Sequence, residues 1–193
     1  MTGATPSQTV GPFFSFGMGW MEAGAELVGP GDPGALALHG RVLDGDGAGV
    51  PDALVEIWQA DAGGRFPGGR FPDGRLRGEG PGPGGPSEPE WSGFGRCLTG
   101  ADGRYRFTTV QPGRVDSDQA PHIDVSIFAR GLLQRLVSRV YFPDEERANR
   151  ADPVLSGLDD RSRAATLVAV ADDGGLRWDV RLQGDDETVF FAW

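Results

Sequence analysis

His122 and Asp124 are the residues of this sequence whose types and spacing best suggest a chemical role. They lie two positions apart in the segment 122–128 (HIDVSIF), whose alternation of apolar and polar residues predicts a β-strand. Side chains at positions i and i+2 of a strand point to the same face. A nitrogen donor and an oxygen donor would therefore face one way, and such a pair suits non-haem iron or zinc.

A mononuclear metal site needs at least one further protein ligand, and this sequence offers few. The 193 residues include 2 His, 2 Tyr and 1 Cys. Tyr105 and Tyr141 lie in predicted strands, but no pattern places either of them beside His122. The sequence also contains no Ser-His-Asp arrangement, phosphate-binding loop or nucleotide motif. We therefore expect a buried His122 that is hydrogen-bonded to Asp124 or to the backbone, and not a metal ligand.

The elements that position these residues are predicted to be strands. Short alternating segments are separated by turns rich in glycine and proline, of which the chain has 32 and 15. The predicted strands cover residues 36–44, 53–60, 95–99, 105–110, 122–128, 136–142, 166–171, 176–183 and 187–191. The turn sequences DGDGAGVPD and GADGR predict that the strands flanking each turn pair as antiparallel neighbours. We also expect a short helix over 145–149, capped by Asp144.

The predicted fold class is all-β, a single β-sandwich domain over residues 1–193. Two segments show no strand or helix periodicity. Residues 1–20 form an arm with several aromatic side chains, and burial of one such side chain typically contributes about 1.5–3 kcal/mol. We therefore expect the arm to pack against the protein body or another chain. Residues 61–93 form a Gly/Pro-rich loop, and a loop of this length is usually functional or disordered.

Composition argues against several classes of partner. The net charge of −10 disfavours nucleic acid, which needs a basic surface. The sequence has no apolar run long enough to span a membrane, and its first residues lack the pattern of a signal peptide. Cys97 is the single cysteine, so no disulfide can form within the chain. We therefore expect a cytoplasmic protein that binds neither nucleic acid nor membrane.

Five segments together resemble the intradiol ring-cleavage dioxygenases, a family of β-sandwich proteins. They are TPSQTVGPFF (5–14), HGRVLDGDGAGVPDALVEIWQADAGGRF (39–66), GFGRCLTGADGRYRFTTVQPG (93–113), APHIDVSIFARG (120–131) and RWDVRLQGDDETVFF (177–191). The resemblance covers nearly the whole chain except residues 67–92. It is strongest to the non-catalytic α subunits, which pair with a homologous iron-binding β subunit in αβ units that assemble into a larger oligomer.

The resemblance implies that this chain carries a degenerate metal site. The iron-binding subunits of the family hold Fe(III) with two tyrosines and two histidines. The matching positions here are Phe66, Val115, His122 and Asp124. Phenylalanine and valine cannot supply phenolate oxygens, so the resemblance implies that this chain binds no metal and carries no catalytic residue. A family arginine before the first histidine is replaced by Gln119.

The resemblance also implies a role in the partner's substrate pocket. The arm residues Thr9, Gly11, Pro12 and Phe13, together with Arg130, would line that pocket in the β subunit. The substrate would be protocatechuate, a carboxylated catechol that is cleaved with O2 to 3-carboxy-cis,cis-muconate in the β-ketoadipate pathway. A guanidinium suits its carboxylate, and a glycine with apolar neighbours suits its ring. The simpler interpretation of Arg130 is a surface arginine.

Two other functions remain open on sequence grounds. The chain could be an intradiol dioxygenase that is active by itself as a homo-oligomer, although Phe66 and Val115 argue against it. It could also be a transthyretin-like β-sandwich that serves as a binding module. In either case Arg135 and Arg139, on the strand after Arg130, are expected to be solvated or to lie in an interface.

Overall fold

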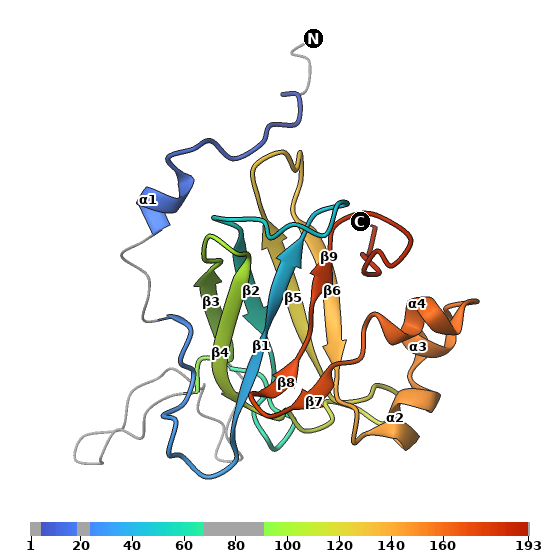
Figure 1. The fold of residues 1–193 in the computed structure, drawn as a ribbon. Helices are drawn as coiled ribbons and strands as arrows, with labels where there is room; N and C mark the ends of the chain where they lie inside the picture. Colours follow the sequence, from blue (N-terminus) through green and yellow to red (C-terminus); the bar gives the residue numbers. More distant parts are fainter. Residues whose placement is uncertain (1–4, 19–23, 68–90, 193) are drawn as a thin grey trace, which may run out of the picture.

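A computed structural model describes residues 5–18, 24–67 and 91–192 of the chain, and these form two packed β-sheets (Figure 1). One sheet has the strand order β4-β1-β8-β7, with β9 also paired to β1, and the other has the order β3-β2-β5-β6. The strands are β1 (Ala35–Leu43), β2 (Leu54–Trp58), β3 (Phe94–Leu98), β4 (Arg104–Val110), β5 (His122–Phe128), β6 (Leu136–Tyr141), β7 (Val170–Asp172), β8 (Gly175–Arg177) and β9 (Val180–Arg181). The predicted β-sandwich is confirmed.

The core lies between the two sheets and follows from the alternation along each strand. In β5, Ile123, Val125 and Ile127 are fully buried and belong to the main apolar cluster. Phe107 of β4 enters the same cluster from the opposite sheet. His122 and Asp124 therefore lie on the outer face of β5, as the period of two requires.

The predicted hairpin pairings are wrong. β1 pairs with β4, and β2 pairs with β3 and β5, so the turn after β1 carries the chain from one sheet to the other. The turn GADGR likewise connects β3 and β4, which belong to different sheets. Alternation reports which face of a strand is apolar, but it does not report the neighbour of that strand. In a sandwich, consecutive strands bury their apolar faces against each other across the core.

The helices differ from the prediction in number and in capping. They are α1 (Phe14–Met18), α2 (Glu146–Ala151), α3 (Pro153–Ser156) and α4 (Arg161–Ala165). The predicted helix corresponds to α2, but Asp144 does not cap it, because Glu145 occupies the cap position and makes no side-chain cap bond. The Asp144 carboxylate oxygen Oδ2 instead lies 3.4 Å from Gln111 Nε2.

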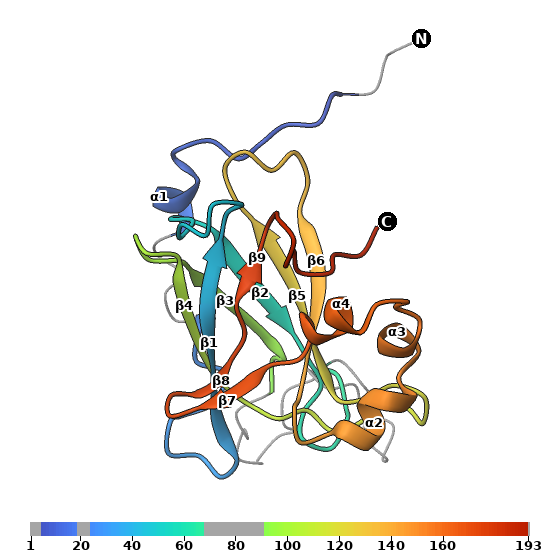
Figure 2. The same cartoon turned by 45° about the vertical axis from the view of Figure 1, so that its right-hand side comes forward.

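The C-terminal strands are shorter than predicted. The segment 166–171 forms a strand only from Val170 onward, and 176–183 is divided between β8 and β9. Residues 187–191 form no strand, although the Phe191 backbone N–H donates to the Val137 carbonyl over 2.8 Å. Helices α2 to α4 lie together at one side of the sandwich (Figure 2).

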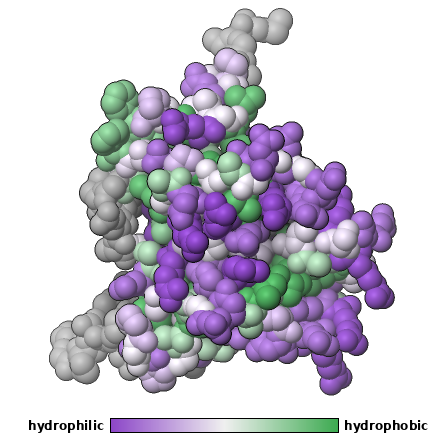
Figure 3. All heavy atoms as spheres, in the orientation of Figure 1, coloured by the Kyte–Doolittle hydropathy of each residue, from purple (hydrophilic) through white to green (hydrophobic). Residues whose placement is uncertain are grey.

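The N-terminal arm extends away from the sheets (Figures 1 and 2). Phe13 is 78% exposed and Phe16 is 80% exposed, and α1 buries no residue. Figure 3 shows hydrophobic atoms gathered at the upper left, where α1 lies in Figure 1. These two rings do not pack against the described body of the protein, so another chain stays the expected partner of the arm. The part of the predicted 61–93 loop at 68–90 lies outside the described residues. Among those described, no helix has the length and hydropathy of a membrane span.

Candidate functional site

His122 is buried and bonded to the backbone, as predicted. Its Nδ1 lies 2.8 Å from the Ala120 carbonyl oxygen, while its Nε2 is 3.9 Å from Asp124 Oδ1. Burial lowers the pKa of His122 below the usual range, and the positive charge of Arg139 lowers this pKa further. The ring is therefore neutral at pH 7, with Nδ1–H donating to the carbonyl.

Arg139 is the partner of Asp124, and its side chain is 22% exposed in this chain. The two residues lie opposite each other in the register of β5 and β6. Arg139 Nε donates to Asp124 Oδ1 over 2.9 Å, and its Nη1 donates to Gln119 Oε1 over 3.1 Å. The guanidinium also lies 6.0 Å from the centre of the Phe191 ring. Within the described chain, the guanidinium of Arg139 is the positive group that pairs with Asp124.

Tyr141 lies directly beside His122, which the sequence did not indicate. The two residues are register partners, and their ring centres are 5.7 Å apart. The Tyr141 hydroxyl donates to Asp152 Oδ1 over 3.0 Å. Burial raises the pKa of Tyr141 far above the usual value. The phenol is therefore protonated at neutral pH and donates its hydrogen bond to Asp152.

Asp152 is a further important residue that the sequence analysis missed. It is fully buried, and its carboxylate accepts hydrogen bonds from the Ala120, Val154 and Leu155 backbone N–H groups and from the Tyr141 hydroxyl. It thereby caps α3 and holds the segment before β5. The Asp-Pro pair at 152–153 was the available signal, because proline favours the first position of a helix.

Phe66 and Val115, which were predicted to match the two tyrosines, lie on loops in backbone contact. The Gly113 backbone N–H donates to the Asp61 carbonyl over 2.9 Å. The Phe66 ring stacks on Trp58 with centres 5.8 Å apart and planes 6° apart, and Trp58 is the register partner of Asp124. The structure thus brings Phe66 close to the strand that carries Asp124, while Val115 is 42% exposed.

These residues do not fit an Fe(III) centre. One neutral imidazole and one carboxylate are present, the carboxylate is engaged by Arg139, and the phenol of Tyr141 is engaged by Asp152. In the described part of the chain, no group of three or more His, Cys, Asp or Glu side chains is arranged to hold a metal ion. No redox chemistry can therefore be assigned to this position.

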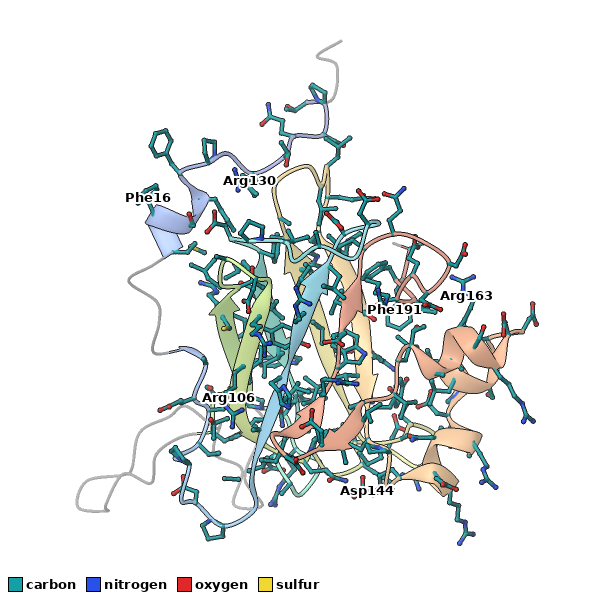
Figure 4. All side chains as sticks on the ribbon, in the orientation of Figure 1. Phe16, Arg106, Arg130, Asp144, Arg163 and Phe191 are labelled. Atoms are coloured by element: carbon teal, nitrogen blue, oxygen red, sulfur yellow. The ribbon has the colours of Figure 1, made fainter. Side chains whose placement is uncertain are left out.

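Two of the predicted substrate-pocket residues, Thr9 and Arg130, lie near each other at the opposite end of β5. Arg130 follows the strand, and the next residue, Gly131, donates its backbone N–H to Thr9 Oγ1 over 2.8 Å. The arm therefore reaches the loop that carries Arg130, as Figure 4 shows from the labelled side chain. Gly11, Pro12 and Phe13 are exposed beyond this contact. The structure brings Thr9 to this loop, and it leaves the other three arm residues without a buried environment in this chain.

The fold is a β-sandwich, and the described residues around His122 and Asp124 offer no donor set for Fe(III). A family model described as "Dioxygenase" matches residues 11–184. The chain is 43% identical to the protocatechuate 3,4-dioxygenase alpha chain of Burkholderia cepacia, an alignment that covers 97% of this chain and 96% of the relative. The chain therefore belongs to the intradiol dioxygenase family.

Two further similarities agree with this assignment. The protocatechuate 3,4-dioxygenase beta chain of Burkholderia cepacia is 32% identical, over 79% of this chain and 66% of that protein. The dioxygenase domain of a carbohydrate-binding fusion protein from Streptomyces sp. SirexAA-E superimposes with a TM-score of 0.56 at 25% identity. That match covers 83% of this chain and 87% of the other. The chain is thus similar to an alpha chain over nearly its full length and to a beta chain over most of it.

Proposed function

We propose that this chain is the non-catalytic α subunit of a protocatechuate 3,4-dioxygenase. It pairs with a homologous β subunit that binds the iron, and the complex cleaves protocatechuate with O2 to 3-carboxy-cis,cis-muconate. The observation that carries the proposal is the 43% identity to an alpha chain over nearly the full length of both proteins. The residues around His122 support it, because the part of the chain that the structure describes offers no donor set for Fe(III).

Within the complex, this chain would complete the substrate pocket of its partner. Arg130 is half-exposed and can offer its guanidinium to a carboxylate in two parallel hydrogen bonds. The exposed arm supports the same arrangement, because Phe13 and Phe16 lack a burying surface within the described chain. A single cysteine suits a cytoplasmic location for such an enzyme.

Expression with and without a partner tests the proposal. We expect the chain alone to be colourless, free of iron and inactive. Co-expressed with the homologous two-Tyr, two-His subunit, it should form a complex that contains iron and turns over protocatechuate. Stoichiometric iron and turnover in the chain alone would instead favour a self-sufficient homo-oligomeric enzyme. Failure to associate with any such subunit would favour a binding module.

The substitution Arg130→Ala tests the pocket role inside that complex. We expect the KM for protocatechuate to rise about tenfold, since a charge-assisted hydrogen bond contributes roughly 1.5–3 kcal/mol. The KM for catechol, which lacks the carboxylate, should change little. Arg150→Ala, which removes an exposed arginine of α2, is the matched control. Equal effects of Arg130→Ala on both substrates would remove the charge-recognition role.

A further inference from the structure

Asp52 has an unusual backbone. Its φ is +58°, and it is the one residue other than glycine with a positive φ in the described part of the chain. Glycine adopts this left-handed conformation most easily, whereas aspartate and asparagine tolerate it at some cost. A side chain at such a position suggests that the carboxylate itself has a role.

The turn that carries Asp52 is firmly held. The Asp52 backbone N–H lies 3.3 Å from the Thr99 carbonyl oxygen. The Thr99 hydroxyl donates to the Val50 carbonyl over 2.7 Å and accepts from the Ala53 backbone N–H over 2.9 Å. Thr99 is itself buried. The position of the Asp52 backbone is therefore fixed by hydrogen bonds on both sides of the residue.

The carboxylate of Asp52 faces Arg130. Leu54 of β2 pairs with Phe128 of β5, and continuing this antiparallel register by two residues places Asp52 opposite Arg130. Asp52 Oδ2 lies 3.5 Å from Arg130 Nη2. Among the described residues, this is the only side-chain hydrogen bond of Arg130. The remaining nitrogens of the guanidinium are therefore open to a ligand.

We propose that Asp52 is a positioning residue for Arg130, and this inference rests on the proposed function. An unrestrained arginine loses rotamer entropy when a ligand fixes it. Asp52 restrains the guanidinium from one side through Nη2, while the Thr9–Gly131 hydrogen bond holds the adjacent backbone. Because arginine has five N–H donors, one contact leaves the others for the substrate carboxylate. Asp52 thus prepares Arg130 for a carboxylated ring without touching the substrate.

The test uses Asp52→Asn in the assembled αβ complex. Asparagine tolerates the left-handed backbone, so the turn is retained while the charge is removed. We expect the KM for protocatechuate to rise about threefold, because exposed ion pairs typically contribute 0.2–1 kcal/mol. The kcat for protocatechuate and the KM for catechol should stay within about twofold of wild type, within that same range. Glu146→Gln, which breaks the exposed Glu146–Arg150 pair on α2, is the matched control.

A double-mutant cycle with Arg130→Ala separates the two proposals. If Asp52 acts through Arg130, Asp52→Asn has no further effect on KM in the Arg130→Ala background. If KM is unchanged in Asp52→Asn but raised in Arg130→Ala, the positioning role of Asp52 is overturned and the pocket role of Arg130 stands. A lowered KM in Asp52→Asn also overturns it, because the carboxylate would then compete with the substrate. Unchanged values in both single variants refute the pocket role of Arg130 itself.

Discussion

Asp152 connects the helical side of the molecule to the segment before β5. Its buried carboxylate accepts four hydrogen bonds, three from backbone N–H groups and one from Tyr141. When a buried donor loses its acceptor, the full free-energy cost of desolvating that donor remains. Asp152, a residue far from His122 in sequence, therefore helps to hold the segment around His122 in place.

We predict that Asp152→Ala lowers the free energy of unfolding by about 3 kcal/mol or more, because several buried donors lose their acceptor together. Asp160→Ala is the matched control, since Asp160 caps α4 through one exposed contact with the Ser162 backbone N–H. The control substitution should lower the free energy of unfolding by about 1 kcal/mol. Urea unfolding of both variants provides the comparison, and equal costs would contradict the central role of Asp152.

The pH dependence of stability should contain a contribution from His122. Its pKa is lowered in the folded chain, so the unfolded chain binds a proton first as the pH falls. The contribution of His122 to stability is complete above its pKa in the unfolded chain, about 6.5. It is lost as the pH falls from there towards the pKa of His122 in the folded chain. His122→Asn keeps a donor for the Ala120 carbonyl and removes the titration. We expect the variant to lose less stability than wild type between about pH 7 and pH 5.5, and parallel curves would contradict this.

Residue types alone indicated part of this site. His122 was correctly expected to be buried and bonded to the backbone, because a period of two set its face and few possible ligands accompany it. Arg139 and Tyr141 were missed, since their place beside Asp124 and His122 depends on the register of β5 and β6. Register is set by the loop between two strands, and the loop sequence here does not specify it.

At the scale of elements, two loops fix the relative positions of Phe66 and Val115. Gly64 has φ +76°, and a Cβ there would lie 2.0 Å from the Arg114 carbonyl oxygen. That distance leaves no room for a side chain, so the loops can meet only at a glycine. A Cβ at the neighbouring Gly63 would meet side-chain atoms, the movable end of Arg65 at 2.9 Å and Asp61 Oδ1 at 3.2 Å, and not backbone.

We predict that Gly64→Ala destabilises the chain by about 2 kcal/mol or more, through backbone strain and the clash with the carbonyl. Gly63→Ala should cost much less, since the Arg65 side chain can move aside. Thermal unfolding of the two variants measures the difference. Similar melting temperatures would show that the loops separate freely.

The positions of the strands were predicted better than the pairing between them. The segments that became β1 to β6 were recognised because each alternates between apolar and polar residues. The pairing of these strands was not predicted correctly, since the turns after Leu43 and Leu98 have hairpin-like sequences but connect strands of different sheets. The pairs of β1 with β8 and β9 are parallel and distant in sequence, so no local pattern could have indicated them.

At the scale of the whole molecule, the arm contributes little to the chain that carries it. A hydrogen bond between Thr9 and Gly131 joins the arm to the body, and Phe13 and Phe16 remain exposed. Two aromatic side chains in water represent about 3–6 kcal/mol of burial that is not realised within this chain. The arm is therefore expected to stabilise an assembly more than the isolated sandwich.

We predict that the double variant Phe13→Ser/Phe16→Ser weakens association with the iron-binding subunit at least tenfold, a loss of about 1.4 kcal/mol. The melting temperature of the isolated chain should hardly change. Val170→Ser, at an exposed apolar residue of β7, is the matched control. Analytical ultracentrifugation measures the association, and an unchanged affinity with both rings removed would exclude the arm from the interface.

The central place of β1 in its sheet has a consequence for synthesis of the chain. One edge of β1 is covered by β4, but the other is covered only by β8 and β9, from Gly175 to Arg181. On the ribosome, a nascent chain that already contains β1 and β4 therefore exposes an open strand edge, and such edges are prone to aggregation. Most of the polypeptide must therefore leave the ribosome before the edge of β1 is paired. A chain truncated before Gly175 is expected to be aggregation-prone and not to form a smaller stable sandwich.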